Sequence, residues 1–276
     1  MTGQASFPPG PQAPTLNVPT ASDNSSASSP NTKFPHPILA IVLVVVSFFA
    51  ASFVAEVAVS LYPLSQHWSN AQSQHWLDTN TAVQFAFTLL AYTLMLIPIV
   101  LYMRRYGITR RDIGLTRPRM SDVGWGLLAL PLYFISYGII VSVVSGLVPG
   151  LNVDQKQQIG FQGASGTDAL ILTFVSLAII PPFAEEFLMR GFLFTSLRAR
   201  TKMLAAVLIT SVVFAAGHLQ FGSGAPLLWV AALDTFTLSL FLIYLRVKTN
   251  SLWASIALHA LKNTIAFVVI FVFHKG

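Results

Sequence analysis

The sequence predicts an all-α fold, a polytopic membrane helical bundle of about seven transmembrane helices that follows a disordered N-terminal tail. Of the 276 residues, 54% are hydrophobic and only 9% are charged, whereas soluble domains carry about 25% charged residues. The apolar residues form long segments, each near the ~20 residues that a helix needs to cross a bilayer. Basic residues concentrate in the short loops between these segments, which is typical of membrane topology.

The elements follow in order from composition. Residues 1–35 are rich in Pro, Ser, Ala, Asn and Thr and do not resemble a signal peptide, so we expect a disordered cytoplasmic tail. The apolar segments are 37–62, 82–103, 122–148, 168–198, 203–220, 226–246 and 251–273. The fourth is too long for a simple span. It either crosses and continues along the interface or breaks at Pro181-Pro182, where two backbone donors are missing.

The loop charges predict an orientation. Lysine and arginine cluster before the first segment and after the second, fourth and sixth, in the set Lys33, Arg104, Arg105, Arg110, Arg111, Arg117, Arg119, Arg198, Arg200, Lys202, Arg246 and Lys248. The opposite side has only Lys156 and Lys275. The positive-inside rule therefore places the N-terminus in the cytoplasm and the C-terminus outside, and we expect a multi-pass protein of the plasma (inner) membrane.

Polar residues inside the segments are few, and several lie at similar depth. The set is Glu56, Glu185, Glu186, Arg190, His218, Asp234, His259, Lys262 and Asn263. Measured from the basic loops at about 1.5 Å per helical residue, Glu185 lies roughly 20 Å deep, His218 roughly 24 Å and His259 roughly 16 Å. Ionisable groups in lipid are costly unless they are paired, hydrated or protonated. We therefore expect three helices to share one polar pocket.

Helix phase predicts partners within this set. Glu186 and Arg190 are four residues apart and share a face, so we expect an ion pair. Glu185 is turned about 100° away from Glu186 and is freer to take up a proton near neutral pH. His259 and Asn263 share a face of the last segment in the same way.

Three motifs occur in a fixed order: Glu-Glu-x-x-x-Arg at 185–190, Phe-x-x-x-His at 214–218 and His-x-x-x-Asn at 259–263. With Arg-Gly-Phe following the glutamates, they resemble the motifs of the CAAX-protease and bacteriocin-processing (CPBP, or Abi) intramembrane endopeptidases, which include Rce1-like CAAX prenyl proteases. The resemblance implies a catalytic helical core over 165–276, preceded by N-terminal transmembrane helices and a basic loop over 36–164. The catalytic positions it implies are Glu185, Glu186, Arg190, His218, His259 and Asn263.

Two mechanisms remain open for such a site. In the first, Glu185 and His218 activate a water while His259 and Asn263 stabilise the oxyanion that forms. In the second, a metalloprotease mechanism, Glu185, His218 and His259 hold a divalent metal such as zinc, which lowers the pKa of a bound water. The local His-Glu-x-x-His spacing of zincins is absent from the sequence.

Two sequence features depart from this pattern. Asp234 is an extra acid in a segment where the family resemblance implies small glycine-rich positions, and we expect it to pair with Lys262 or to support the pocket. The stretch Gly163-Ala-Ser165-Gly166 fits the Gly-x-Ser-Gly of rhomboid-type serine proteases. It lies in a polar loop on the outer side, so a nucleophilic role for Ser165 is disfavoured.

Function classes other than a protease also fit buried acids and imidazoles. A proton-coupled membrane transporter is one alternative, and a non-catalytic bacteriocin-immunity-type adaptor is another. The net charge of +6 is explained by the basic loops, so we expect no nucleic-acid partner. The expected partners are the lipid bilayer and a membrane-associated peptide or protein substrate. The chain has no cysteine, which excludes disulfides and thiolate chemistry.

Overall fold

A computed structural model of the chain describes residues 33–155, 157, 159–221 and 226–273. All the regular structure in this described part is helical, which confirms the all-α prediction. Six of these helices are long and apolar enough to cross a membrane, and a shorter apolar helix accompanies them. The chain is therefore a multi-pass integral membrane protein. Apart from residues 33–35, the disordered tail expected over 1–35 lies outside the described residues.

The first helices form a packed pair. The helices α1 (Pro37–Ser65) and α3 (Thr81–Arg105) contact each other along their lengths, and the short helix α2 (Asn70–Thr79) joins them. A capping box starts α2: the Gln72 N–H donates to the Ser69 hydroxyl, and the Ser69 N–H donates to the Gln72 side chain. Asn80 caps α3 by accepting from the Val83 N–H.

The fourth predicted segment is one continuous helix from Thr167 to Arg198. It consists of α5 (Thr167–Phe174), η1 (Val175–Ile179), α6 (Ile180–Glu186), η2 (Phe187–Leu193) and α7 (Phe194–Arg198), of which η1 and η2 are π-helical. The expected break at Pro181-Pro182 does not occur. In η1 the Ile180 N–H already bonds to the Val175 carbonyl, so the turn is widened just where proline removes donors.

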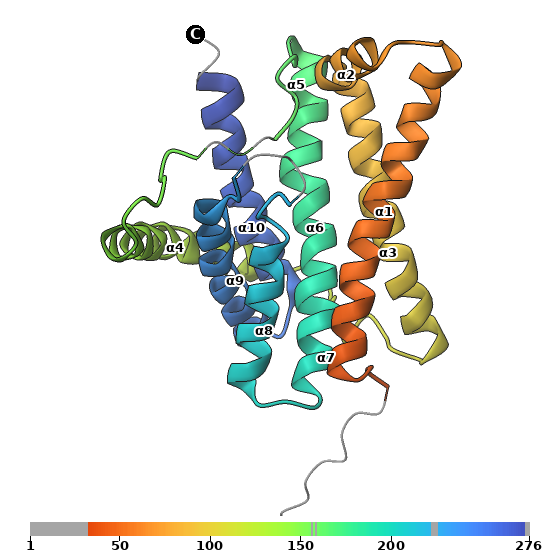
Figure 1. The fold of residues 1–276 in the computed structure, drawn as a ribbon. Coiled ribbons are helices and arrows are strands. Elements are labelled where there is room, and N and C mark those ends of the chain that lie inside the picture. Colours follow the sequence, from red (N-terminus) through yellow and green to blue (C-terminus); the bar gives the residue numbers. More distant parts are fainter. Residues whose placement is uncertain (1–32, 156, 158, 222–225, 274–276) are drawn as a thin grey trace, which may run out of the picture. The chain divides into compact units, whose positions relative to one another are not determined.

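This long helix, hereafter the central helix, lies between the α1–α3 pair and the C-terminal helices (Figure 1). The C-terminal helices are α8 (Met203–Ala216), α9 (Trp229–Thr249) and α10 (Leu252–Phe267), which continues into the π-helical η3 (Val268–Phe273). Helix α8 spans only part of the length of the central helix and ends earlier than the predicted 203–220 segment. His218 therefore follows the helix instead of belonging to it. Non-helical backbone at membrane depth is tolerated where protein or a wet cavity surrounds it.

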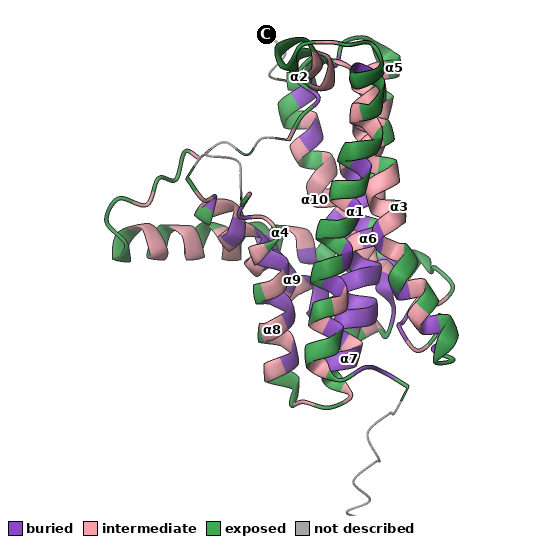
Figure 2. Ribbon diagram, turned by 45° about the vertical axis from the view of Figure 1, so that its right-hand side comes forward, coloured by how far each residue is buried: buried purple, intermediate pink, exposed green. Residues whose placement is uncertain are grey.

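The predicted third span forms α4 (Met120–Leu147), which lies crosswise to the other long helices (Figures 1 and 2). It packs on α9 and α10 through its N-terminal half. At Gly126 a Cβ atom would come 2.9 Å from the backbone nitrogen of Leu258, so only glycine permits this approach. Figure 2 shows that buried residues concentrate on the central helix, whereas the residues in the second half of α4 are exposed or intermediate and none is buried.

The basic loops contact one another across the sequence. The Leu252 N–H donates to the Gly114 carbonyl, which joins the loop after α9 to the loop after α3. The Arg200 guanidinium donates to the Phe34 carbonyl, which joins the loop after α7 to the segment before α1. The loops that carry most of the lysine and arginine residues are thus hydrogen-bonded to one another in pairs. These are the loops that were predicted to lie on the cytoplasmic side.

Candidate active site

A fully buried ion pair forms the centre of the site. Arg190 Nη1 donates to Glu186 Oε1 at 2.9 Å, and both side chains have no exposed surface. The face of the Phe214 ring lies 4.4 Å from the Arg190 guanidinium carbon, which adds a cation–π contact. The ion pair expected from the four-residue spacing is therefore confirmed.

His259 of α10 binds to the same carboxylate. Its Nδ1 lies 3.0 Å from Glu186 Oε1, an oxygen that the arginine also contacts. A carboxylate that is ion-paired with arginine can only accept hydrogen bonds, so Nδ1 carries the proton. Nε2 of His259 is then available to contact another group. That Nε2 lies 3.8 Å from Glu185 Oε2, which is too long for a direct hydrogen bond and short enough for one water to contact both atoms.

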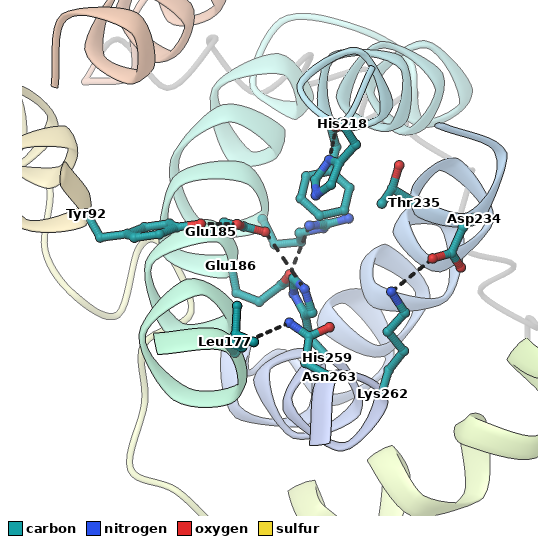
Figure 3. A network of polar contacts seen from close by, with 12 residues as sticks. Tyr92, Leu177, Glu185, Glu186, His218, Asp234, Thr235, His259, Lys262 and Asn263 are labelled. Carbon is teal, nitrogen blue, oxygen red and sulfur yellow. Dashed lines mark hydrogen bonds and ion pairs between the residues drawn. The ribbon is translucent and has the colours of Figure 1, made fainter. Parts of the chain in front are cut away.

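Glu185 is held from the other side by a residue that the sequence did not suggest. The hydroxyl of Tyr92, on α3, donates to Glu185 Oε1 at 2.7 Å (Figure 3). The second oxygen of Glu185, Oε2, is buried without a hydrogen-bond partner among the described residues. Tyr92 was missed because tyrosine is common in apolar helices and α3 carries none of the three motifs.

His218 reaches the same region from the segment after α8. Its Nδ1 lies 2.8 Å from the Phe214 carbonyl, which can only accept, so Nδ1 is protonated, and Nε2 has no hydrogen-bond partner among the described residues. The Phe214 ring packs edge-on against both imidazoles, with centroids 4.8 Å from His218 and 5.9 Å from His259. Phe214 thus forms a wall of the site.

Asn263 contacts the backbone of the central helix. Its side-chain Nδ2 donates to the Leu177 carbonyl at 2.9 Å. This carbonyl lacks a partner within its own helix, because the residues four and five positions further on are Pro181 and Pro182, and neither has an N–H. Asn263 therefore satisfies the acceptor that the prolines leave free, and this bond ties α10 to the helix that carries the two glutamates.

This contact predicts a rescue. Asn263→Ala should lower stability, and the loss should shrink by about 1 kcal/mol in a Pro181→Ala background, where residue 181 regains an N–H for Leu177. Thermal unfolding of the wild type, both single variants and the double variant measures this coupling. If the stability losses of the two single variants simply add in the double variant, Asn263 does not stabilise the protein through the Leu177 carbonyl. If the double variant regains stability but not activity, the remaining loss of activity reports a direct role of the Asn263 side chain in the reaction.

A second polar group lies beside the site (Figure 3). Lys262 Nζ and Asp234 Oδ2 form an ion pair at 2.9 Å, which confirms the expected pairing. The Tyr133 hydroxyl of α4 also donates to Asp234. These contacts join α4, α9 and α10, so the extra acid is explained by an interhelical network.

The predicted zinc ligands do not assemble. Among the residues that the structure describes, no three His, Asp or Glu side chains lie in an arrangement that could hold a metal ion. Glu185 and His259 approach each other, but His218 is turned by its bond to the Phe214 carbonyl and packs on the Phe214 ring. The donor set as placed does not fit a three-ligand zinc site.

Ser165 lies apart from all these groups. It is exposed, in the loop that precedes α5. If the protein has the peptidase activity that its motifs imply, the Ser165→Ala variant should cleave peptides at the wild-type rate, as measured by product formation in lipid vesicles. A substantial loss of rate in this variant would favour a serine nucleophile over the glutamate centre.

The fold and the site together define a multi-pass membrane protein with a carboxylate–imidazole centre buried between its helices. Residues 167–265 match the family model described as type II CAAX prenyl endopeptidase Rce1-like. Over this region the chain is therefore similar to the Rce1-like family of CAAX-type proteases, and the resemblance seen in the motifs is confirmed. The matched region contains the six catalytic positions that the motifs imply and excludes α3, which carries Tyr92. No curated protein and no solved structure matches the chain.

Proposed function

We propose that the protein is an intramembrane endopeptidase that hydrolyses a peptide bond of a membrane-associated protein or peptide with a water activated by Glu185. One observation carries the proposal: Glu185 Oε2 and His259 Nε2 lie 3.8 Å apart. The other oxygen of Glu185 is bonded to Tyr92, and the other ring nitrogen of His259 is bonded to Glu186. A proton acceptor and an imidazole nitrogen are thus held rigidly on two sides of one small space.

Buried polar atoms around this space support the presence of water. Glu185 Oε2, Glu186 Oε2 and the Nε and Nη2 atoms of Arg190 have no hydrogen-bond partner among the described residues. Buried polar groups are nearly always paired, with protein or with ordered water. The site therefore suits a small cluster of water molecules, which hydrolysis requires.

In the proposed reaction, Glu185 Oε2 takes a proton from a water as the water oxygen attacks the scissile carbonyl carbon. His218, whose Nε2 has no hydrogen-bond partner in the described part of the chain, orients the same water. The carbonyl oxygen becomes an oxyanion, which protonated His259 stabilises through Nε2–H and Asn263 through its second amide hydrogen. Protonated Glu185 then donates to the leaving amine as the carbon–nitrogen bond breaks, which restores the carboxylate.

The two flanking carboxylates explain how His259 can act as a donor. Nδ1–H is already committed to Glu186, so donation from Nε2 requires the imidazolium. The imidazole lies between two carboxylates, with Nδ1 3.0 Å from Glu186 Oε1 and Nε2 3.8 Å from Glu185 Oε2. The ion pair of Glu186 with Arg190 in turn holds the acceptor in place.

We further propose that residues 165–276 form the catalytic core and residues 36–164 the preceding membrane helices, with the N-terminus in the cytoplasm. The contacts between basic loops support this orientation. Because the central helix contacts α3 as well as α8 and α10, the core is enclosed by helices from both parts.

The test is a cleavage assay with purified full-length protein in lipid vesicles. A peptide with one apolar spanning segment and a short flanking tail is incubated with wild-type and Glu185→Gln protein, and products are identified by mass spectrometry. Cleavage by the wild type alone supports the proposal. Absence of cleavage together with proton-driven uptake of a solute that survives Glu185→Gln would favour a transporter instead.

A further inference from the structure

We infer that Tyr92 is a positioning residue of the active site: its phenol selects which oxygen of Glu185 meets the water. The inference rests on the proposed function, and it extends the site to a helix outside the Rce1-like region.

The geometry separates the two oxygens of Glu185. Oε1 accepts the Tyr92 hydroxyl at 2.7 Å, and Oε2 lies toward His259 Nε2 at 3.8 Å without a hydrogen-bond partner of its own. A carboxylate can rotate about its last bond, so its two oxygens would otherwise exchange places. The phenol fixes one oxygen, which keeps the other in the space where the substrate water is expected.

A phenol suits this position better than a cation would. A hydroxyl donor stabilises the ionised carboxylate without cancelling its charge, so Glu185 remains able to take a proton. The other titratable or charged groups around Glu185 are His259 from α10, His218 from the segment after α8, and Glu186 and Arg190 from its own helix. Among the described residues, Tyr92 forms a hydrogen bond with the Glu185 side chain, and none of these four groups does.

The position of α3 makes this contact possible. Helix α3 packs against η1, α6 and η2, so one of its faces follows the central helix past Glu185. Met95 and Ile99, one and two turns further along α3, are buried in the same core cluster as Leu188 and Phe192. This apolar packing fixes how α3 is aligned along the central helix, and it therefore places the Tyr92 hydroxyl beside Glu185.

The test compares Tyr92→Phe with Tyr102→Phe in the full-length protein. Each removes one hydroxyl from α3 and keeps the ring; Tyr102 packs on Phe192 at 5.8 Å and is not part of the polar centre. Tyr92→Phe should lower kcat about tenfold to hundredfold with little change in KM. The acid limb of its pH–rate profile should move to higher pH, because the ionised carboxylate loses a donor. Tyr102→Phe should retain both parameters and the profile.

A second measurement does not depend on cleavage. Dicyclohexylcarbodiimide is an apolar reagent that modifies protonated carboxyl groups, and mass spectrometry locates the product. Glu185 should be modified faster in Tyr92→Phe than in the wild type at the same pH, and at the wild-type rate in Tyr102→Phe. Unchanged kcat, pH profile and labelling in Tyr92→Phe would overturn the inference while Glu185-dependent cleavage still stands. Faster labelling in a protein that cuts no peptide would instead overturn the proposed function and retain the hold of Tyr92 on Glu185.

Discussion

Glu185→Gln is expected to lower the rate of peptide cleavage by about 10²- to 10⁴-fold, the range for loss of a general base. Glutamine has nearly the volume of glutamate, and its carbonyl oxygen can still accept the Tyr92 hydroxyl. What it cannot do is take the proton of the attacking water. The loss should therefore appear in kcat, with KM and thermal stability close to those of the wild type.

The matched control is Glu56→Gln. Glu56 is an exposed carboxylate on α1, in a surface hollow that it shares with Trp68 and Leu77. The same chemical change there should leave kcat unchanged. If Glu185→Gln cuts at the wild-type rate, Glu185 is not the base; if both variants lose activity together, the assay reports a general effect of lost negative charge.

Arg190→Met is expected to lower the free energy of unfolding by about 3–5 kcal/mol, since removing one partner leaves Glu186 buried and uncompensated. Methionine retains part of the arginine stem, and its thioether can contact the Phe214 ring in place of the guanidinium group. The measurement is unfolding in detergent micelles, followed by loss of helical circular dichroism. The yield of folded Arg190→Met protein should also be lower than that of the wild type.

The control for this prediction is the double variant Glu186→Gln, Arg190→Met. The substituted glutamine carries no charge but still offers a carbonyl oxygen to the His259 Nδ1–H, so the fold should recover part of the lost stability. If the double variant is less stable than Arg190→Met alone, the cost does not arise from an unpaired buried carboxylate. A wild-type stability for Arg190→Met would contradict the prediction outright.

Local patterns predicted two ion pairs, one within a single helix and one between two helices. The four-residue spacing of Glu186 and Arg190 placed them on one face, and their pair formed as expected. Opposite charges at Asp234 and Lys262 predicted a pair across two helices because neither could remain alone in lipid. The first prediction depends on the spacing along one helix, and the second on the high free-energy cost of an unpaired charge in lipid.

Helix ends and exceptions to the regular helix were less predictable. The prolines at 181 and 182 suggested a break, but the preceding π-helical turn and the Asn263 side chain compensate for the missing donors. Helix α8 stops before His218, and α4 lies crosswise although it is apolar enough to span. In each case, contacts from other helices determine the outcome.

The sequence by itself determined that the protein is a helical bundle in the membrane, because hydropathy and helical period are local properties, and its motifs supplied the residues that we propose for the chemistry. Only the tertiary structure decided that Tyr92 meets Glu185, that His259 joins both glutamates and that Leu177 accepts from Asn263. These contacts link residues from 73 to 93 positions apart. They depend on the rotation and register of packed helices, which follow from side-chain fit across whole interfaces and are not encoded in any single segment.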